Sequence, residues 1–153
     1  MWQGMLEAHS RLADFLPYRL AITSNAVTGL IAGDYGEKFG LTVPEWRIMA
    51  VLGEAGAMTQ RDLVRATLID KVAVNRACKA LDARGLVARS PNAADGRSHH
   101  LLLSEAGRAM HDKIWPLARA DYERIFAVLS DAEAQTLRAL LDKLLASVRR
   151  LKA

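Results

Sequence analysis

Residues 58–104 read MTQRDLVRATLIDKVAVNRACKALDARGLVARSPNAADGRSHHLLLS, and this stretch decides the fold. Thr59, with Asp62 three residues later, gives a weak N-cap signal, because the Asp side chain reaches less far than Glu. A short helix is predicted from there to the turn at residues 68–70. The last residue of that turn is an Asp, which is placed to cap a second helix.

The second helix of this stretch has one apolar face. Val74, Ala77, Cys78 and Leu81 recur at the spacing i, i+3, i+4 and i+7, which aligns side chains along one side of an α-helix. Gly85 is predicted to end the helix, because glycine adopts the left-handed conformation without steric cost. The residues that flank the apolar stripe are therefore expected to face solvent or a ligand.

Two short strands are predicted next, at Leu86–Arg89 and at about Ser98–Leu103. Residues 90–97 between them are a run of turn formers, so the strands are expected to pair as a hairpin. Two helices joined by a turn and followed by a hairpin make a winged helix-turn-helix. Its second helix has the size to enter the major groove of DNA, and its hairpin tip reaches the minor groove or the backbone.

The positive charge of the chain is concentrated in this segment. Residues 60–100 hold eight Lys and Arg side chains against four Asp, which is a net charge of +4. The whole 153-residue chain also has a net charge of +4, so the remaining charges cancel. A local excess of this kind is expected of a surface that faces phosphates, although a solvated face with chance clustering is the simpler alternative.

The segments on either side read as helices. One is predicted from about Leu16 to Lys38, and Ser130 with Glu133 forms a capping box at the start of a C-terminal helix. That helix carries a wide apolar stripe made of Leu137, Leu140, Leu141, Leu144, Leu145, Val148 and Leu151. Such a stripe is buried either in an ordinary bundle within the chain or against a second copy. We favour the second copy, because a dimer doubles the DNA contacts and spaces two reading helices about 34 Å apart.

Taken in order, these segments resemble the MarR family of bacterial transcriptional regulators, from about Leu41 to about Pro116. The most telling pieces are Pro44–Arg47, Asp70–Lys71, Leu81–Arg89, Asp95–Arg97 and Ser104–Arg108. The resemblance implies a mainly α (α+β) fold, with one MarR-type domain over residues 1–153 and a winged DNA-binding lobe at about 41–104. It also implies dimerisation helices at about 10–38 and 105–153, which form a bundle with those of a second copy.

The candidate DNA contacts lie on the second helix and the hairpin tip. They are Lys71, Ala73, Asn75, Arg76, Lys79, Asp95 and Arg97. Asn75 has the carboxamide that pairs with adenine, and Arg76 has the guanidinium that pairs with guanine. Arg97 is expected to enter the minor groove, where A·T-rich stretches concentrate negative potential. The resemblance assigns Asp95 the role of orienting that arginine, and a simple tight turn is the alternative.

The resemblance also implies a small effector, commonly an aromatic or phenolic acid that releases the DNA. A cation for its carboxylate and an aromatic wall are expected, and the candidates are Arg19, Trp46, Arg47, His9 and Ser24. The alternative places Trp46 in the core and Arg19 on the surface or at the dimer interface. We therefore expect a homodimeric repressor that is released from a palindromic operator by such an acid.

Other chemistries are less well supported. Cys78 lies on the apolar stripe and is expected to be an inert core residue, which disfavours redox sensing. His99 and His100 are neighbours on a strand, and His9 and His111 show no ligand spacing with them, so no metal site and no cofactor are predicted. Neither a phosphate-binding loop nor a GxSxG elbow is present in the sequence, which argues against an enzyme.

The sequence has no signal segment and only one cysteine, so a cytoplasmic location is expected. A winged-helix module used only for protein contacts remains an alternative, because the fold alone does not ensure DNA binding. Activation in place of repression is a further alternative, since the outcome depends on where the operator lies.

Overall fold

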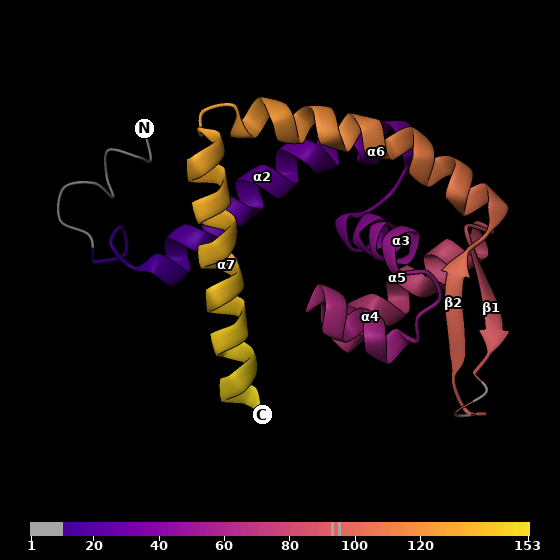
Figure 1. Ribbon diagram of the computed structural model, residues 1–153. Coiled ribbons are helices and arrows are strands. Elements are labelled where there is room, and N and C mark those ends of the chain that lie inside the picture. The colour runs from indigo at the N-terminus through magenta and orange to yellow at the C-terminus, as the bar shows by residue number, and fades with distance from the viewer. Residues whose placement is uncertain (1–10, 93, 95) are drawn as a thin grey trace. The chain divides into compact units, whose positions relative to one another are not determined.

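The computed structural model describes residues 11–153 except 93 and 95. It is mainly helical with one two-stranded antiparallel sheet, and its winged helix-turn-helix confirms the predicted fold class (Figure 1). The elements are α2 (Leu16–Phe39), α3 (Val43–Ala55), α4 (Gln60–Thr67), α5 (Lys71–Ala83), β1 (Val87–Pro91), β2 (His99–Leu103), α6 (Glu105–Phe126) and α7 (Asp131–Lys152). No helix in the described part of the chain is long and apolar enough to span a membrane.

The chain divides into two compact units, residues 1–118 and residues 119–153. The boundary falls within α6, two residues after Pro116. Proline has no backbone N–H to donate, so the helix loses one of its internal hydrogen bonds at this point. The first unit contains the winged lobe, and the second contains the end of α6 and all of α7.

The helix-turn-helix begins with a capping box that the sequence signalled only weakly. Asp62 N–H donates to Thr59 Oγ1, and Thr59 N–H donates to Asp62 Oδ2, both at 3.1 Å. Leu68 ends α4 in the left-handed region with φ of 55°, which is rare for a residue with a branched side chain. Asp70 then caps α5 as predicted, because its Oδ1 accepts a hydrogen bond from Ala73 N–H at 2.9 Å.

The apolar stripe of α5 forms the centre of the core. Its four residues, Val74, Ala77, Cys78 and Leu81, are each at most 4% exposed. They belong to one buried cluster with the fully buried side chains of α3 and α4, which are Ile48, Met49, Leu52 and Leu63. Burying a side chain of this size contributes about 1.5–3 kcal/mol, so the stripe fixes the rotation of α5 about its own axis.

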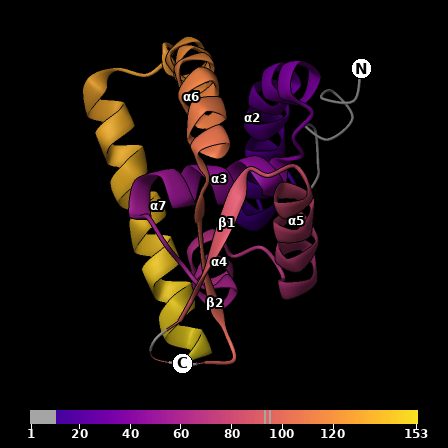
Figure 2. The ribbon, with the colours of Figure 1, turned by 90° about the vertical axis from the view of Figure 1, so that its right-hand side faces the viewer.

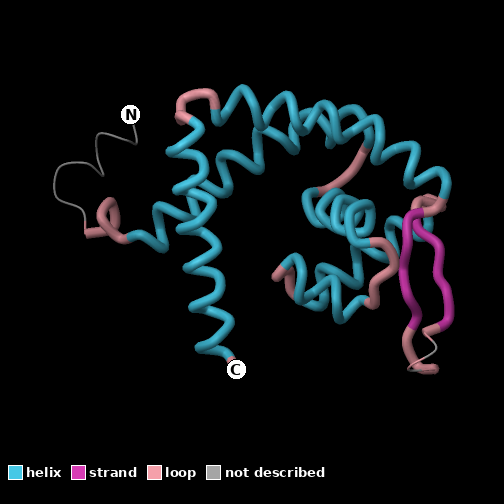
Figure 3. The backbone as a smooth tube through the Cα atoms, in the orientation of Figure 1, coloured by secondary structure: helices cyan, strands magenta, loops and turns pink. Residues whose placement is uncertain are grey.

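The wing is a short hairpin anchored to the helices at its base. Strands β1 and β2 lie side by side as an antiparallel pair (Figures 2 and 3). In their register Val87 lies opposite Leu103 and Pro91 opposite His99. Leu101 also exchanges two backbone hydrogen bonds with Met58, at 2.9 and 2.7 Å, which ties β2 to the residue just before the Thr59 cap.

The first strand begins and ends later than the predicted Leu86–Arg89. Leu86 does not join the strand, because its N–H donates to Leu81 O of the last turn of α5 at 3.0 Å. Gly85 precedes it with φ of 68°, in the left-handed conformation predicted for this helix end. Pro91 is tolerated at the end of the strand because this two-stranded sheet has free edges.

Helix α2 is joined to the end of α5 by one side chain. Arg84 donates hydrogen bonds to Phe39 O at 2.9 Å and to Gly40 O at 3.1 Å. These carbonyls end α2, and the C-terminal end of a helix carries partial negative charge, which favours a guanidinium there. The contact therefore ties the C-terminal end of α5 to the C-terminal end of α2.

Helix α7 follows a complete capping box, as predicted. Ser130 Oγ accepts from Glu133 N–H at 3.1 Å, and Glu133 Oε2 accepts from Ser130 N–H at 2.8 Å. None of the residues of α7 is buried in the single chain. Its apolar stripe is between 36% and 85% exposed, at Leu137, Leu140, Leu141, Leu144, Leu145, Val148 and Leu151.

Substitution of Gly107 tests how closely α6 approaches the wing. A Cβ at this position would overlap the carbonyl oxygen and carbon of Leu86, which are backbone atoms and cannot rotate away. Gly107→Ala is therefore expected to lower the free energy of unfolding by about 1–3 kcal/mol. Gly33→Ala in α2 is the control, because a Cβ there meets nothing within 4 Å and alanine favours helix. Equal stability of the two variants in chemical denaturation would contradict the packing described.

Candidate nucleic-acid interface

The buried stripe of α5 turns the other residues of the helix toward solvent. Lys71, Arg76 and Lys79 are exposed, and Ala73 and Asn75 are half-buried. On an ideal helix these last two lie at the two edges of the exposed face. Five of the seven DNA-contact candidates therefore share the solvent-facing side of one helix.

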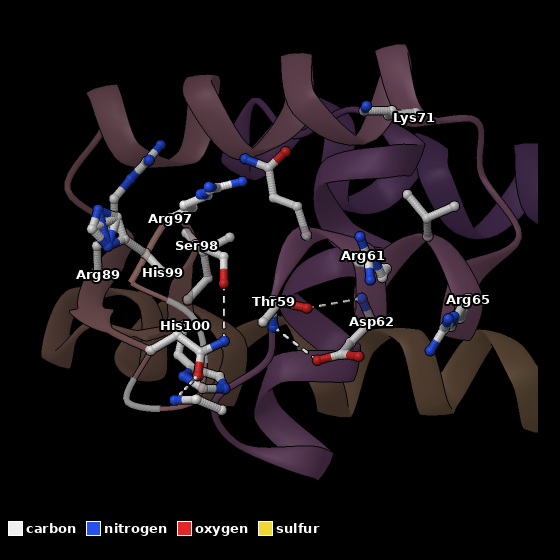
Figure 4. A pocket seen from close by; sticks show the side chains of 15 residues that line it. Thr59, Arg61, Asp62, Arg65, Lys71, Arg89, Arg97, Ser98, His99 and His100 are labelled. Atoms are coloured by element: carbon white, nitrogen blue, oxygen red, sulfur yellow. Dashed lines mark hydrogen bonds between the residues drawn. The ribbon is translucent and has the colours of Figure 1, made fainter.

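A groove of about 1100 Å³ lies between α4, the start of α5 and the wing (Figure 4). Arg61 and Arg65 of α4 line one side of it, and Arg89 and Arg97 of the wing line the other. Lys71, at the first position of α5, also borders it. The groove therefore brings together cations from α4, from the start of α5 and from the wing.

Three of these cations were not predicted as DNA contacts: Arg61, Arg65 and Arg89. Among the described residues, the lining holds five guanidinium or ammonium groups and one carboxylate, that of Asp62. Phosphate oxygens are the ligands that such a surface prefers. The sequence signal that could have found these residues is the local charge excess, which already included all three.

Asp62 does not act as a counter-charge alone, because its carboxylate is engaged in the α4 cap. Hydrogen bonds from the Thr59 hydroxyl and the Thr59 N–H hold the pKa of the Asp62 carboxyl below its ordinary value. A lowered pKa means that the cap stabilises the fold above the ordinary pKa of Asp and is lost as pH falls through the lowered value. At neutral pH Asp62 is therefore a carboxylate that stabilises the start of α4.

The hairpin is closed where the wing tip begins. Asn92 donates a side-chain hydrogen bond to Ser98 Oγ at 2.9 Å, and its N–H donates to Ser98 O at 3.3 Å. Arg97 lies just beyond this closure and lines the groove. Asp95, the predicted orienting residue, lies outside the described residues. Arg89 Nε lies 3.5 Å from Asp82 Oδ2, so an ion pair links the wing to α5.

Comparison with known proteins decides the family. Residues 39–98 match the sequence model described as the MarR family. The HTH-type transcriptional repressor NicR of Pseudomonas putida is 31% identical over 107 residues, which span 70% of this chain and 68% of that protein. The chain belongs to the MarR family. MarR-family regulators are DNA-binding transcription factors and not enzymes. The predictions of a DNA-binding transcriptional regulator and of a protein that is not an enzyme are therefore confirmed.

Solved structures agree with this assignment. A crystal structure described as a probable transcriptional regulator from Pseudomonas aeruginosa is 36% identical, with a TM-score of 0.75 over 88% of this chain and 99% of that one. BpsR of Bordetella bronchiseptica, whose DNA binding is regulated by 6-hydroxynicotinic acid, is 26% identical. Its TM-score is 0.79 over 90% of this chain and 97% of that one.

The effector candidates of this MarR-family chain do not form one cluster. Arg47 of α3 donates to Thr28 Oγ1 of α2 at 3.3 Å, whereas Arg19 reaches back to Ala13 O at 3.3 Å. Nine residues of helix, about 13 Å, separate Arg19 from Thr28. The two guanidinium groups therefore lie apart within one chain. Ser24 is exposed on α2, and His9 lies outside the described residues.

Trp46 is 7% exposed and lies within a column of aromatic rings. Its ring centroid is 5.7 Å from that of Tyr35 and 5.6 Å from that of His111, and Trp115 stacks on His111 at 6.0 Å. Burial raises the pKa of the Tyr35 hydroxyl, and the nearby Arg47 partly offsets this rise. The column joins α2, α3 and α6, so Trp46 has a packing role whether or not it also borders an effector.

In the described part of the chain, no group of three or more His, Cys, Asp or Glu side chains is placed to hold a metal ion. His99 and His100, which are neighbours on β2, both border the cationic groove.

Cys78 is 1% exposed, and burial raises the pKa of its thiol to about 11. Thiolate is the reactive form, so the folded protein is expected to resist alkylation by iodoacetamide at pH 8. The same thiol should react rapidly in 6 M guanidinium chloride, and mass spectrometry of the labelled protein measures both rates. Rapid labelling of the folded protein would contradict this placement and would reopen the redox-sensing alternative.

Proposed function

We propose that this MarR-family protein is a homodimeric repressor that binds a palindromic operator and releases it when a small aromatic acid binds. The observation that carries the DNA-binding part is the cationic groove lined by α4, the start of α5 and the wing. Neutralising phosphates releases condensed counterions, so each additional cation in contact strengthens binding and steepens its dependence on salt. The relatives named as repressors support repression over activation.

The contacts divide into those that hold the duplex and those that read it. Arg61, Arg65 and Arg89 are proposed to bind backbone phosphates on either side of the DNA major groove, into which α5 inserts. Asn75 and Arg76 are proposed to read base edges, and Arg97 to enter the minor groove from the wing. Operator DNA is held in the cytoplasm, where we expect the protein to act.

Two variants test the division of roles. Arg97→Ala is expected to weaken operator binding by about 1–3 kcal/mol, whereas Asn75→Ala should relax the preference at one base pair in each half-site. Fluorescence anisotropy with a duplex selected from a random pool measures both effects. Lys113→Ala is the control, because Lys113 is an exposed cation of α6 outside the cationic groove. Unchanged affinity and unchanged base preference in both variants at moderate salt would refute the assignment.

The dimer is supported by apolar surface that one chain leaves exposed. The stripe of α7 has no buried residue, and α2 exposes Leu16, Leu20, Ile22 and Leu30 at 44–73%. A two-fold pair that covers these faces removes them from water, and at about 25 cal/mol per Å² a typical interface of this kind is strongly stabilising.

Sedimentation equilibrium tests the dimer. We expect a dimer at micromolar concentration, and Leu144→Asp should shift the population toward monomer because it places a charge in the proposed apolar interface. Loss of the dimer should weaken operator binding by removing one lobe. A well-folded monomer with full affinity for the palindrome would overturn this part of the proposal.

The effector part rests on Arg47 and on a relative. Arg47 of α3 has an exposed side chain that reaches Thr28 of α2, and we propose that its guanidinium binds the carboxylate of the effector. BpsR responds to 6-hydroxynicotinic acid, which has one aromatic ring and one carboxylate. We propose an acid of that class for this protein.

A thermal-shift screen of hydroxybenzoates, hydroxycinnamates and hydroxynicotinates tests the effector. A ligand that binds only the folded state stabilises it by about 2.7 kcal/mol at a concentration of 100 times Kd, so Tm should rise with concentration. Arg47→Gln should remove the rise for acids, and the matching amides should give none. A rise that is the same for acid and amide would contradict the role of Arg47.

A further inference from the structure

Helix α5, the proposed recognition helix, presents a large apolar side chain at the centre of its exposed face. Val72 is 67% exposed. Between residues 59 and 92, the other large apolar side chain that is exposed is Leu68, at 57%. Leu68 lies in the turn before α5, whereas Val72 is the second residue of the helix itself. The sequence patterns assigned Val72 no role.

Helix geometry places Val72 directly opposite the core. Successive residues of an ideal α-helix are rotated by about 100°, so Val72 lies about 180° from Leu81, at the middle of the buried stripe. Arg76 and Lys79 fall within about 40° of Val72 on either side. Val72 is therefore the α5 side chain that projects most directly away from the protein, between two cations.

Helix stability gives no reason for valine at this position. An exposed β-branched residue is a poorer helix former than alanine or lysine, because its side chain loses χ1 freedom against the preceding turn. Its apolar surface also remains in water in the free protein. A ligand that covers this surface would account for its chemistry.

The surrounding charge identifies the class of ligand. Lys71, Arg76 and Lys79 flank Val72, and a protein partner that docked an apolar patch here would have to bury these cations. Duplex DNA instead supplies phosphates for the cations and, within the major groove, one apolar group. That group is the C5-methyl of thymine.

We propose that Val72 reads a thymine in each half-site by packing its two methyl groups against the thymine C5-methyl in the major groove. This inference rests on the proposed operator binding. The first residues of a recognition helix are those that approach base edges, and Val72 has no hydrogen-bond donor or acceptor in its side chain. It therefore distinguishes thymine from the other bases by shape and hydrophobicity alone.

Replacing thymidine with deoxyuridine in the operator tests the contact. This change removes only the C5-methyl group of the base and leaves every hydrogen-bonding atom in place. The operator is first obtained by selection from a random duplex pool, and each thymine of one half-site is then replaced in turn. Full-length wild type, Val72→Ala and Val128→Ala are titrated against every duplex. Val128 is 84% exposed and lies between α6 and α7, so Val128→Ala is the same chemical change outside the DNA-binding lobe.

For wild type and Val128→Ala, deoxyuridine at one position should weaken binding about three- to tenfold, as expected from removing one buried methyl group. Val72→Ala should bind the thymine and deoxyuridine duplexes with equal affinity at that position. Its circular dichroism and Tm should match wild type, because the substitution is exposed. A wild type that selects no sequence overturns the proposed function and this contact with it. A sequence-specific wild type whose deoxyuridine profile is unchanged in Val72→Ala overturns the thymine contact alone.

Discussion

The burial of one stripe on α5 is the constraint on which the DNA-binding lobe depends. Val74, Ala77, Cys78 and Leu81 have essentially no exposed surface, and they pack in one cluster with α3 and α4. Only one rotation of the helix about its axis buries such a stripe, so the residues on the opposite side must face solvent or a ligand. The orientation of every side chain offered to DNA is therefore a consequence of core packing and not of the charges themselves.

Fixed rotation also explains how separate elements make one cationic groove. The turn before α5 begins at Leu68 and ends at the Asp70 cap, which brings α4 beside the start of α5. The bridge between Met58 and Leu101 holds the wing against the other end of α4, where that helix begins. Cations that are far apart in the sequence thus line one groove, at a spacing set by core packing, helix caps and backbone hydrogen bonds.

The sequence predicted the parts of this arrangement that depend on local chemistry. The caps at Asp70 and Ser130, the helix end at Gly85 and the buried side of α5 follow from residue type and spacing, and each is found. The start of β1 was predicted one residue early, because Leu86 still bonds to the end of α5. The roles of Arg61, Arg65 and Arg89 were missed, because only tertiary packing brings α4 and the wing together. The apolar stripe of α7 was predicted as a pattern, yet one chain alone does not contain the surface that would cover it.

Protection of single introduced cysteines by DNA tests the central claim, since Cys78 is buried in the unmodified protein. Arg76→Cys and Lys79→Cys place a thiol on the side of α5 opposite the stripe, whereas Glu54→Cys places one on α3, outside the cationic groove. Maleimide labelling of each variant is compared with and without an excess of operator duplex. The account predicts strong protection at positions 76 and 79 and none at 54. Equal labelling at all three positions, or protection at 54 alone, would contradict it.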